Sequence, residues 1–97
     1  MRSLVLGLLL PCLTVPAMAQ AVFKGDDFMV FFFRTPCEIP PLAQYLGRVG
    51  EARKAVIVHE GKRIPACFAK DEDGDYLLIN HEGRGAWIPG QAVESGL

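Results

Sequence analysis

The sequence carries little net charge and lacks the common catalytic motifs. Its 97 residues include 10 lysines and arginines and 11 aspartates and glutamates, which gives a formal net charge of −1. This balance excludes a generally basic nucleic-acid-binding protein, a polybasic membrane-surface protein and an acidic disordered tail. The motifs G-x-S-x-G and H-E-x-x-H, internal repeats and low-complexity linkers are also missing. The length suits one small domain, and we predict no catalytic residue, metal or cofactor.

The N-terminus has the three parts of a secretory signal peptide. Arg2 supplies a positive start, Leu4–Leu13 forms an apolar run of suitable length, and Ala17 and Ala19 place small residues before a cleavage point. We therefore predict a cleaved signal peptide at residues 1–19 and export to the periplasm or the extracellular space.

Two alternatives would keep the chain on a membrane. A spanning helix is not favoured because Pro11 and Pro16 interrupt the run, which is shorter than the roughly 20 apolar residues that a span needs. Acylation of Cys12 is not favoured because a proline precedes it, where bacterial lipoproteins carry a small residue. We expect no stable membrane insertion after cleavage.

The mature domain retains two cysteines. After cleavage, residues 20–97 form one domain of 78 residues that contains Cys37 and Cys67 and, without the arginine of the signal peptide, has a net charge of −2. An even pair of cysteines in a short exported chain predicts a disulfide. In the loop-entropy model, closing a loop of about 30 residues stabilises the fold by about 3.5 kcal/mol. A reactive thiol and a metal site with His59 or His81 are the alternatives, but C-x-x-C and H-x-x-x-H spacings are missing.

The first half of the domain predicts a strand followed by a short helix. The apolar run Phe28–Phe33 has high β propensity, and because both of its faces are apolar we expect a central strand. Two prolines fit the first turn of a helix over residues 40–47, where a missing N–H costs no hydrogen bond. One face of this helix is apolar and carries Leu42, Tyr45 and Leu46. We expect a further helical turn at Glu51–Lys54.

From residue 55 the pattern changes to short β-type runs separated by turns. The runs are Ala55–His59, Ile64–Lys70, Tyr76–Asn80 and Ala86–Pro89. The glycine-containing turns between them favour an antiparallel meander, and we expect the tail at residues 90–97 to form a last turn or to fray. Together the elements predict an α+β domain with one short helix packed on an antiparallel sheet of about five strands.

The disulfide predicts which face of one strand meets the helix. If Cys67 faces the helix, Pro65 and Ala69 do so too, because side chains alternate along a strand. Ile64, Ala66 and Phe68 then face the other side and need a second cover. We expect that cover to come from partial closure of the sheet into a barrel or from a partner.

The acidic segment Asp71–Asp75 has some features of a calcium loop. An EF-hand loop that starts at Asp71 needs glycine at its sixth position, where this chain has Tyr76. The Asp-Gly pair between two β runs is instead a hairpin signal. We predict a solvated turn, with weak calcium binding as the alternative.

Three residues before or within the last β run are candidate binding residues: Trp87, His81 and Arg84. Tryptophan is a frequent hot spot in protein interfaces, although a single tryptophan in a small domain more often lies in the core. His59 and His81 both precede glutamates, and we expect both at exposed strand ends. Neither has a positioned acid, nucleophile or metal that would make it catalytic.

Four short motifs resemble a loose group of small exported two-cysteine proteins of tailed phages and proteobacterial prophages. The motifs are Pro36-Cys37, Pro65-Ala66-Cys67-Phe68, the turn at residues 71–75 and Trp87-Ile88-Pro89. The usual residue of the group after the second cysteine is tryptophan, where this chain has Phe68. The resemblance spans about residues 28–90 and implies a bacterial envelope setting, without an activity that carries over to any residue.

We therefore expect a small binding module that acts on an envelope protein or another envelope component. A phage origin implies an inhibitor of an envelope enzyme such as a lysozyme, or a factor that blocks entry of a second phage. Two alternatives stay open. One is a structural subunit that self-associates through the edge of the Phe28–Phe33 strand. The other is a small hydrolase or metal-dependent enzyme that uses His59 or His81 with the Asp71–Asp75 turn.

Overall fold

The computed structural model describes residues 19–95. The signal-peptide prediction, with Cys12, lies outside the described residues except for Ala19. Along the chain the elements are β2 (Ala19–Lys24), β3 (Phe28–Pro36), α1 (Pro40–Leu46), β4 (Arg53–His59), β5 (Lys62–Lys70), β6 (Tyr76–Asn80), β7 (Gly85–Ile88), the 3₁₀ turn η2 (Gly90–Ala92) and β8 (Glu94–Ser95). No helix within this part of the chain has the length and hydropathy of a membrane span.

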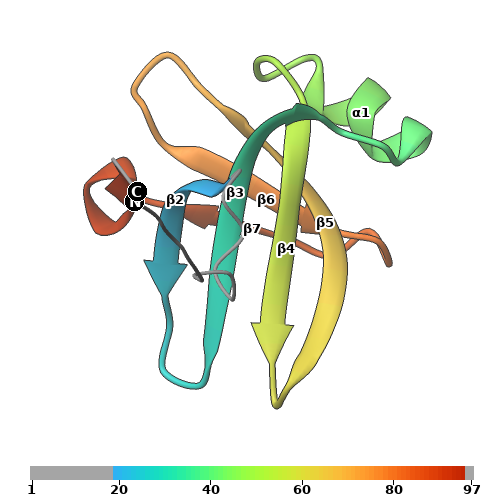
Figure 1. Cartoon of the computed structure of the whole chain (residues 1–97). Coiled ribbons are helices and arrows are strands. Elements are labelled where there is room, and N and C mark those ends of the chain that lie inside the picture. Colours follow the sequence, from blue (N-terminus) through green and yellow to red (C-terminus); the bar gives the residue numbers. More distant parts are fainter. Residues whose placement is uncertain (1–18, 96–97) are drawn as a thin grey trace, which may run out of the picture.

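All strands belong to one antiparallel sheet in the order β7-β6-β5-β4-β3-β2-β8, with α1 on one side (Figure 1). The predicted α+β class and the C-terminal meander are confirmed. The predicted number of about five strands is too low, because β2 and the two-residue β8 extend the sheet to seven. The tail does form a turn, η2, and then continues as β8 along β2.

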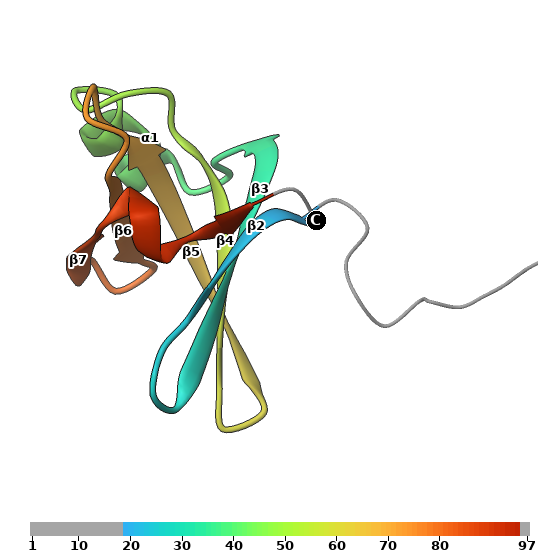
Figure 2. The ribbon, with the colours of Figure 1, turned by 90° about the vertical axis from the view of Figure 1, so that its left-hand side faces the viewer.

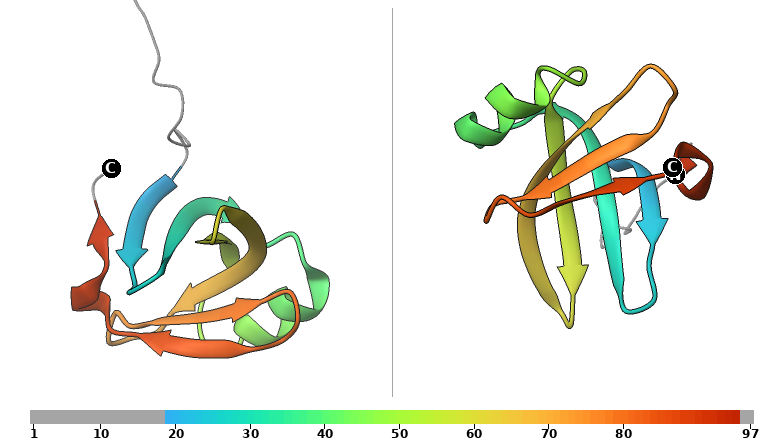
Figure 3. Two further views of the ribbon diagram at one scale, coloured as in Figure 1. Left: turned by 90° about the horizontal axis from the view of Figure 1, so that it is seen from below. Right: turned by 180° about the vertical axis from the view of Figure 1, so that it is seen from behind.

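The sheet curls into a partly closed barrel. The strands β7 and β8 form its two edges, yet only the short segment with η2 separates them along the chain. Seen from below, this segment crosses from one edge to the other and brings the curled sheet nearly full circle (Figure 3). Partial closure of the barrel therefore covers the second face of β5, as the sequence analysis expects.

An aromatic cluster fills the barrel interior. The rings of Phe32 and Phe68 meet edge to face at 4.8 Å, and the ring of Tyr76 lies 4.7 Å from that of Phe32. Phe32 and Phe68 are almost fully buried. The strand β3 is central, between β2 and β4, as its apolar run predicted.

The disulfide and the helix lie on the opposite face of β5. Cys37 and Cys67 are bonded, with an S–S distance of 2.03 Å. Next to the disulfide, a second core cluster joins helix residues to the outer face of β5 and β6: Leu42, Leu46, Cys67, Ala69, Leu77 and Ile79. The alternation predicted for β5 is thus confirmed for Cys67 and Ala69 on one face and Phe68 on the other. Pro65 is exposed.

The helix α1 has nearly the predicted bounds, ending one residue earlier, and the N–H of Gly47 donates to the Ala43 carbonyl at 3.0 Å. The further helical turn predicted at Glu51–Lys54 is wrong, because β4 already begins at Arg53. There the chain pairs with Phe68 of β5 and Pro36 of β3. Pairing on both sides overrides the weak local preference for helix.

The two ends of the sheet differ. At the closed end, α1 and the disulfide cover the C-terminal half of β5. At the open end, the β2–β3 and β4–β5 hairpins extend together beyond the rest of the barrel (Figure 2). The open end is defined by the inward-facing side chains Phe23, Phe28 and Ile57, which are only partly buried.

Candidate functional site

The edge strand β7 presents the tryptophan singled out in the sequence. Trp87 is opposite Leu77 of β6 and therefore lies on the same face of the sheet as the helix. Its side chain is 55% exposed, so the core position that the sequence analysis favours for a single tryptophan is wrong. The physical reason is that β7 is an edge strand with a neighbouring strand on one side only.

Trp87 shares an apolar groove with Tyr45 of α1. This aromatic groove has a volume of about 390 Å³, and its main lining side chains are Leu42, Tyr45, Leu77, Ile79, Ala86 and Trp87. Tyr45 is also 55% exposed. It departs from the prediction of one apolar stripe with Leu42 and Leu46: those two are buried, whereas Tyr45 lines the groove. The spacing of Leu42, Tyr45 and Leu46 along the sequence does not distinguish the exposed tyrosine from the two buried leucines.

Gly85 helps to keep the aromatic groove open. It lies opposite Ile79 in the sheet, on the groove face of β7. A Cβ added to Gly85 would lie 3.1 Å from Ile79 Cγ1 and 3.1 Å from the Leu78 carbonyl oxygen. Any larger residue would therefore occupy space beside Trp87 and press on the neighbouring strand.

A second hollow lies on the other face of β7, at the open end of the barrel. We call it the inner groove; its volume is about 390 Å³. Its apolar walls are Phe23, Phe28, Ile57, Leu78, Ala86 and Ile88, and Arg84 lies at its margin together with Asn80. The Phe23 and Phe28 rings are 5.9 Å apart. The strand β7 thus separates two apolar hollows, and its residues Gly85, Ala86 and Trp87 line both.

The three predicted binding residues do not all belong to this region. Trp87 and Arg84 line the inner groove together. Arg84 is exposed, and its guanidinium forms no ion pair with any residue from 19 to 95. His81 is exposed, lines neither groove, and its backbone N–H donates to the Pro65 carbonyl at 3.0 Å.

The side chain of His59 contacts a backbone carbonyl of the neighbouring hairpin and an exposed glutamate. Nδ1 of His59 is 3.1 Å from the Asp27 carbonyl oxygen, and its Nε2 is 3.8 Å from Glu60. It therefore links the tips of the two hairpins. The alternatives with a reactive thiol or a metal site at Cys37 or Cys67 are wrong, because these two cysteines form the disulfide.

The acidic turn uses its carboxylates to hold the backbone. Oδ1 of Asp71 accepts from the N–H groups of Asp73 and Asp75, each at 2.9 Å. Asp75 Oδ1 accepts from the Gly90 N–H at 3.0 Å and so ties the turn to η2. Over residues 19–95, His, Cys, Asp and Glu side chains form no group of three or more that could hold a metal ion.

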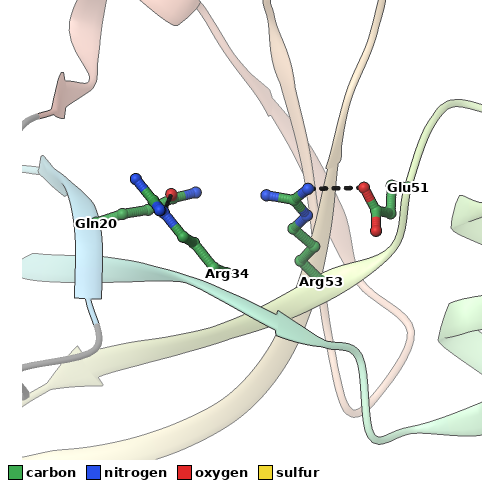
Figure 4. A network of polar contacts seen from close by, with 4 residues as sticks. All are labelled: Gln20, Arg34, Glu51 and Arg53. Carbon is green, nitrogen blue, oxygen red and sulfur yellow. Dashed lines mark hydrogen bonds and ion pairs between the residues drawn. The ribbon is translucent and has the colours of Figure 1, made fainter.

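At the closed end, two arginine side chains form hydrogen bonds with residues of the same chain. Arg34 Nε donates to Gln20 Oε1 at 2.6 Å, and Arg53 Nη2 donates to Glu51 Oε1 at 2.7 Å (Figure 4). These arginines already have partners on their own chain. Arg84, beside the inner groove, has no such partner in the described part of the chain.

In comparisons with known proteins, no protein-family model, no curated protein and no solved structure matches the chain.

Proposed function

We propose that this protein is an exported binding module that holds a protein of the bacterial envelope in the aromatic groove. The observation that carries the proposal is the pair of exposed aromatic side chains, Trp87 and Tyr45, on one apolar groove. Tryptophan and tyrosine dominate the binding energy of protein interfaces, because they bury a large area at a small cost in side-chain entropy. The disulfide is consistent with an oxidising, exported location.

The floor of the aromatic groove belongs to a buried core cluster. The floor residues Leu77 and Ile79 are buried in the cluster that includes the disulfide, and Leu42 anchors the helix on the same cluster. A preorganised surface loses little conformational entropy when a partner binds. This arrangement supports binding more directly than catalysis.

The resemblance to phage and prophage proteins suggests what such binding would achieve. An inhibitor of an envelope enzyme such as a lysozyme and a factor that blocks a second phage both act by occupying a partner's surface. Self-association through an edge of β3 is not available, because β2 and β4 flank β3 on both sides.

The test is a pull-down from Gram-negative periplasmic extract with the mature domain, followed by size-exclusion chromatography of the domain alone. We expect a heterologous partner that is lost with Trp87→Ala and weakened with Tyr45→Ala. A hot-spot residue typically contributes about 2 kcal/mol or more, which is about a 30-fold change in Kd. Glu72→Ala, an exposed residue outside both grooves, is the matched control.

Binding that survives Trp87→Ala and Tyr45→Ala together would contradict the proposal. Concentration-dependent self-assembly without another partner would also contradict it. Circular dichroism and the unfolding midpoint of each variant show that a loss of binding is not a loss of fold.

A further inference from the structure

We propose that β7 binds an extended segment of the partner as an added strand, with an acidic side chain of that segment paired to Arg84. This inference rests on the proposed binding function and specifies its chemistry. It follows from three features of β7 among residues 19–95: a free backbone edge, a hollow on each face, and an arginine without an ion-pair partner at one end.

The hydrogen-bonding pattern identifies the free edge. The Asn80 N–H donates to the Arg84 carbonyl at 2.8 Å, which makes Asn80 and Arg84 a hydrogen-bonded pair between β6 and β7. Such pairs alternate along an antiparallel ladder, so Ala86 and Ile88 also bond to β6. The backbone N–H and carbonyl groups of Gly85 and Trp87 therefore point away from β6, toward the free edge.

Nothing in the described chain uses that edge. The order of the sheet ends at β7, and no backbone hydrogen bond in the turns, loops and caps of residues 19–95 involves Gly85 or Trp87. The opposite edge, β8, has only two residues. An added strand therefore finds more backbone partners at β7.

The two hollows match the geometry of an added strand. Successive side chains of a strand point to opposite faces. Beside β7 they would point alternately into the aromatic groove and into the inner groove, since Gly85, Ala86 and Trp87 line both. In this mode of recognition the backbone bonds give affinity and the alternating pockets give specificity.

Charge and hydropathy define the segment further. The inner groove is walled by half-buried apolar side chains, among them Phe28 and Ile57, so the inward side chains of the segment should be apolar. Arg84 is the one charged residue in the lining of this groove, and no ion pair within residues 19–95 involves it. An antiparallel segment would place its C-terminal side next to Arg84, because β7 runs away from that residue. The acidic residue should therefore follow the apolar ones.

The experiment uses a display library of random dodecapeptides, selected on the immobilised mature domain. We expect enrichment of peptides with alternating apolar residues followed by Asp or Glu. On binding of a synthetic enriched peptide, amide hydrogen exchange of Gly85 and Trp87 should slow at least tenfold, as edge groups become hydrogen-bonded.

Two charge-reversal variants test the role of Arg84. Arg84→Glu should weaken binding of the same peptide by about fivefold at low salt, and about 0.5 M salt should largely remove the difference. Arg63→Glu reverses another exposed arginine that lines neither groove and should leave binding unchanged.

The outcomes separate this inference from the proposed function. No enriched peptide, or an enriched peptide that leaves Gly85 and Trp87 unprotected, would overturn strand addition. Equal effects of Arg84→Glu and Arg63→Glu would overturn the acidic partner. If the envelope partner still depends on Trp87 while the edge amides stay unprotected, the binding module stands and strand addition fails.

Discussion

The closed and open ends of the sheet are built from the same strands, yet they are stabilised very differently. At the closed end, the disulfide, the helix and the contacts of Arg34 and Arg53 hold the chain. At the open end, the apolar side chains of Phe23, Phe28 and Ile57 face inward but are only partly buried. We therefore expect stability to be concentrated at the closed end, while the open end exposes apolar surface next to β7.

The largest contrast should appear between two phenylalanines on the same face of β3. Phe32 is fully buried among Phe68 and Tyr76, whereas Phe28 is partly exposed at the open end. Phe32→Ala should lower the free energy of unfolding by about 4 kcal/mol, because it leaves a cavity in the barrel.

Phe28→Ala is the matched comparison and should cost less than half as much, since its ring is only partly removed from water. Urea unfolding followed by circular dichroism measures both values. Equal losses for the two variants would show that the open end contributes as much to stability as the closed end.

Removal of the disulfide should have the next largest effect. The bond between Cys37 and Cys67 closes a loop with a sequence separation of 30. The double variant Cys37→Ala/Cys67→Ala should lose about 3.5 kcal/mol of unfolding free energy in the loop-entropy model. Urea unfolding of the wild type with and without a reducing agent provides the control for the side-chain change.

The Cys37→Ala/Cys67→Ala variant should also change the hydrogen-exchange rates of the two ends unequally. Hydrogen exchange is expected to speed up first in α1 and the adjacent part of β5, and least in the β2–β3 hairpin. A uniform increase along the whole chain would contradict the separation of the two ends.

The sequence predicts local features of both ends better than it predicts strand pairing. The prolines of α1, the alternation around Cys67 and the glycine turns are local signals, and each matches the structure. The helical turn expected at Glu51–Lys54 fails because pairing with β3 and β5 decides the conformation there. Such pairing depends on residues distant in sequence.

The candidate site shows the same limit. Trp87 and Arg84 could be selected from the sequence as binding residues, but the exposure of Trp87 depends on β7 being an edge strand. The sequence places Tyr45 among the apolar residues of the helix and does not show that it is as exposed as Trp87. β2 and β8 were missed as strands, and β8 is recognisable only from its pairing with β2.

A smaller effect is expected at the turn between β5 and β6. Asp71 accepts two backbone hydrogen bonds and Asp75 accepts one from Gly90. Asp71→Ala should lower the free energy of unfolding by about 1–2 kcal/mol, because the two N–H groups lose their acceptor. Urea unfolding measures the loss, and Glu72→Ala, next to it and exposed, is the control.

Comparison of the wild type with Asp71→Ala in the presence of calcium tests the alternative of weak calcium binding. If the carboxylates serve the backbone, millimolar calcium should leave the unfolding midpoint of the wild type unchanged. A midpoint that rises with calcium in the wild type and not in Asp71→Ala would contradict this interpretation of the turn.

The smallest effect should come from the ionisation of Tyr76 in the aromatic cluster. Burial raises the pKa of Tyr76 above its ordinary value of 10.0, because the charged phenolate is poorly solvated there. The folded state therefore favours the neutral phenol. Its contribution to stability is complete below about pH 10, the unfolded-state pKa, and is lost as the pH rises through the higher folded-state pKa.

Tyr76→Phe tests this directly. The thermal midpoint of the wild type should fall more steeply than that of the variant between about pH 9 and pH 11, while the two differ little near neutral pH. The other tyrosine, Tyr45, is 55% exposed and serves as the internal reference when tyrosinate absorbance is followed. Because Tyr76 belongs to the barrel core and not to either groove, its ionisation should reduce stability without changing binding at neutral pH. Parallel pH dependences for Tyr76→Phe and the wild type would show that the cluster tolerates the phenolate, and would weaken the distinction between a buried core and an accessible open end.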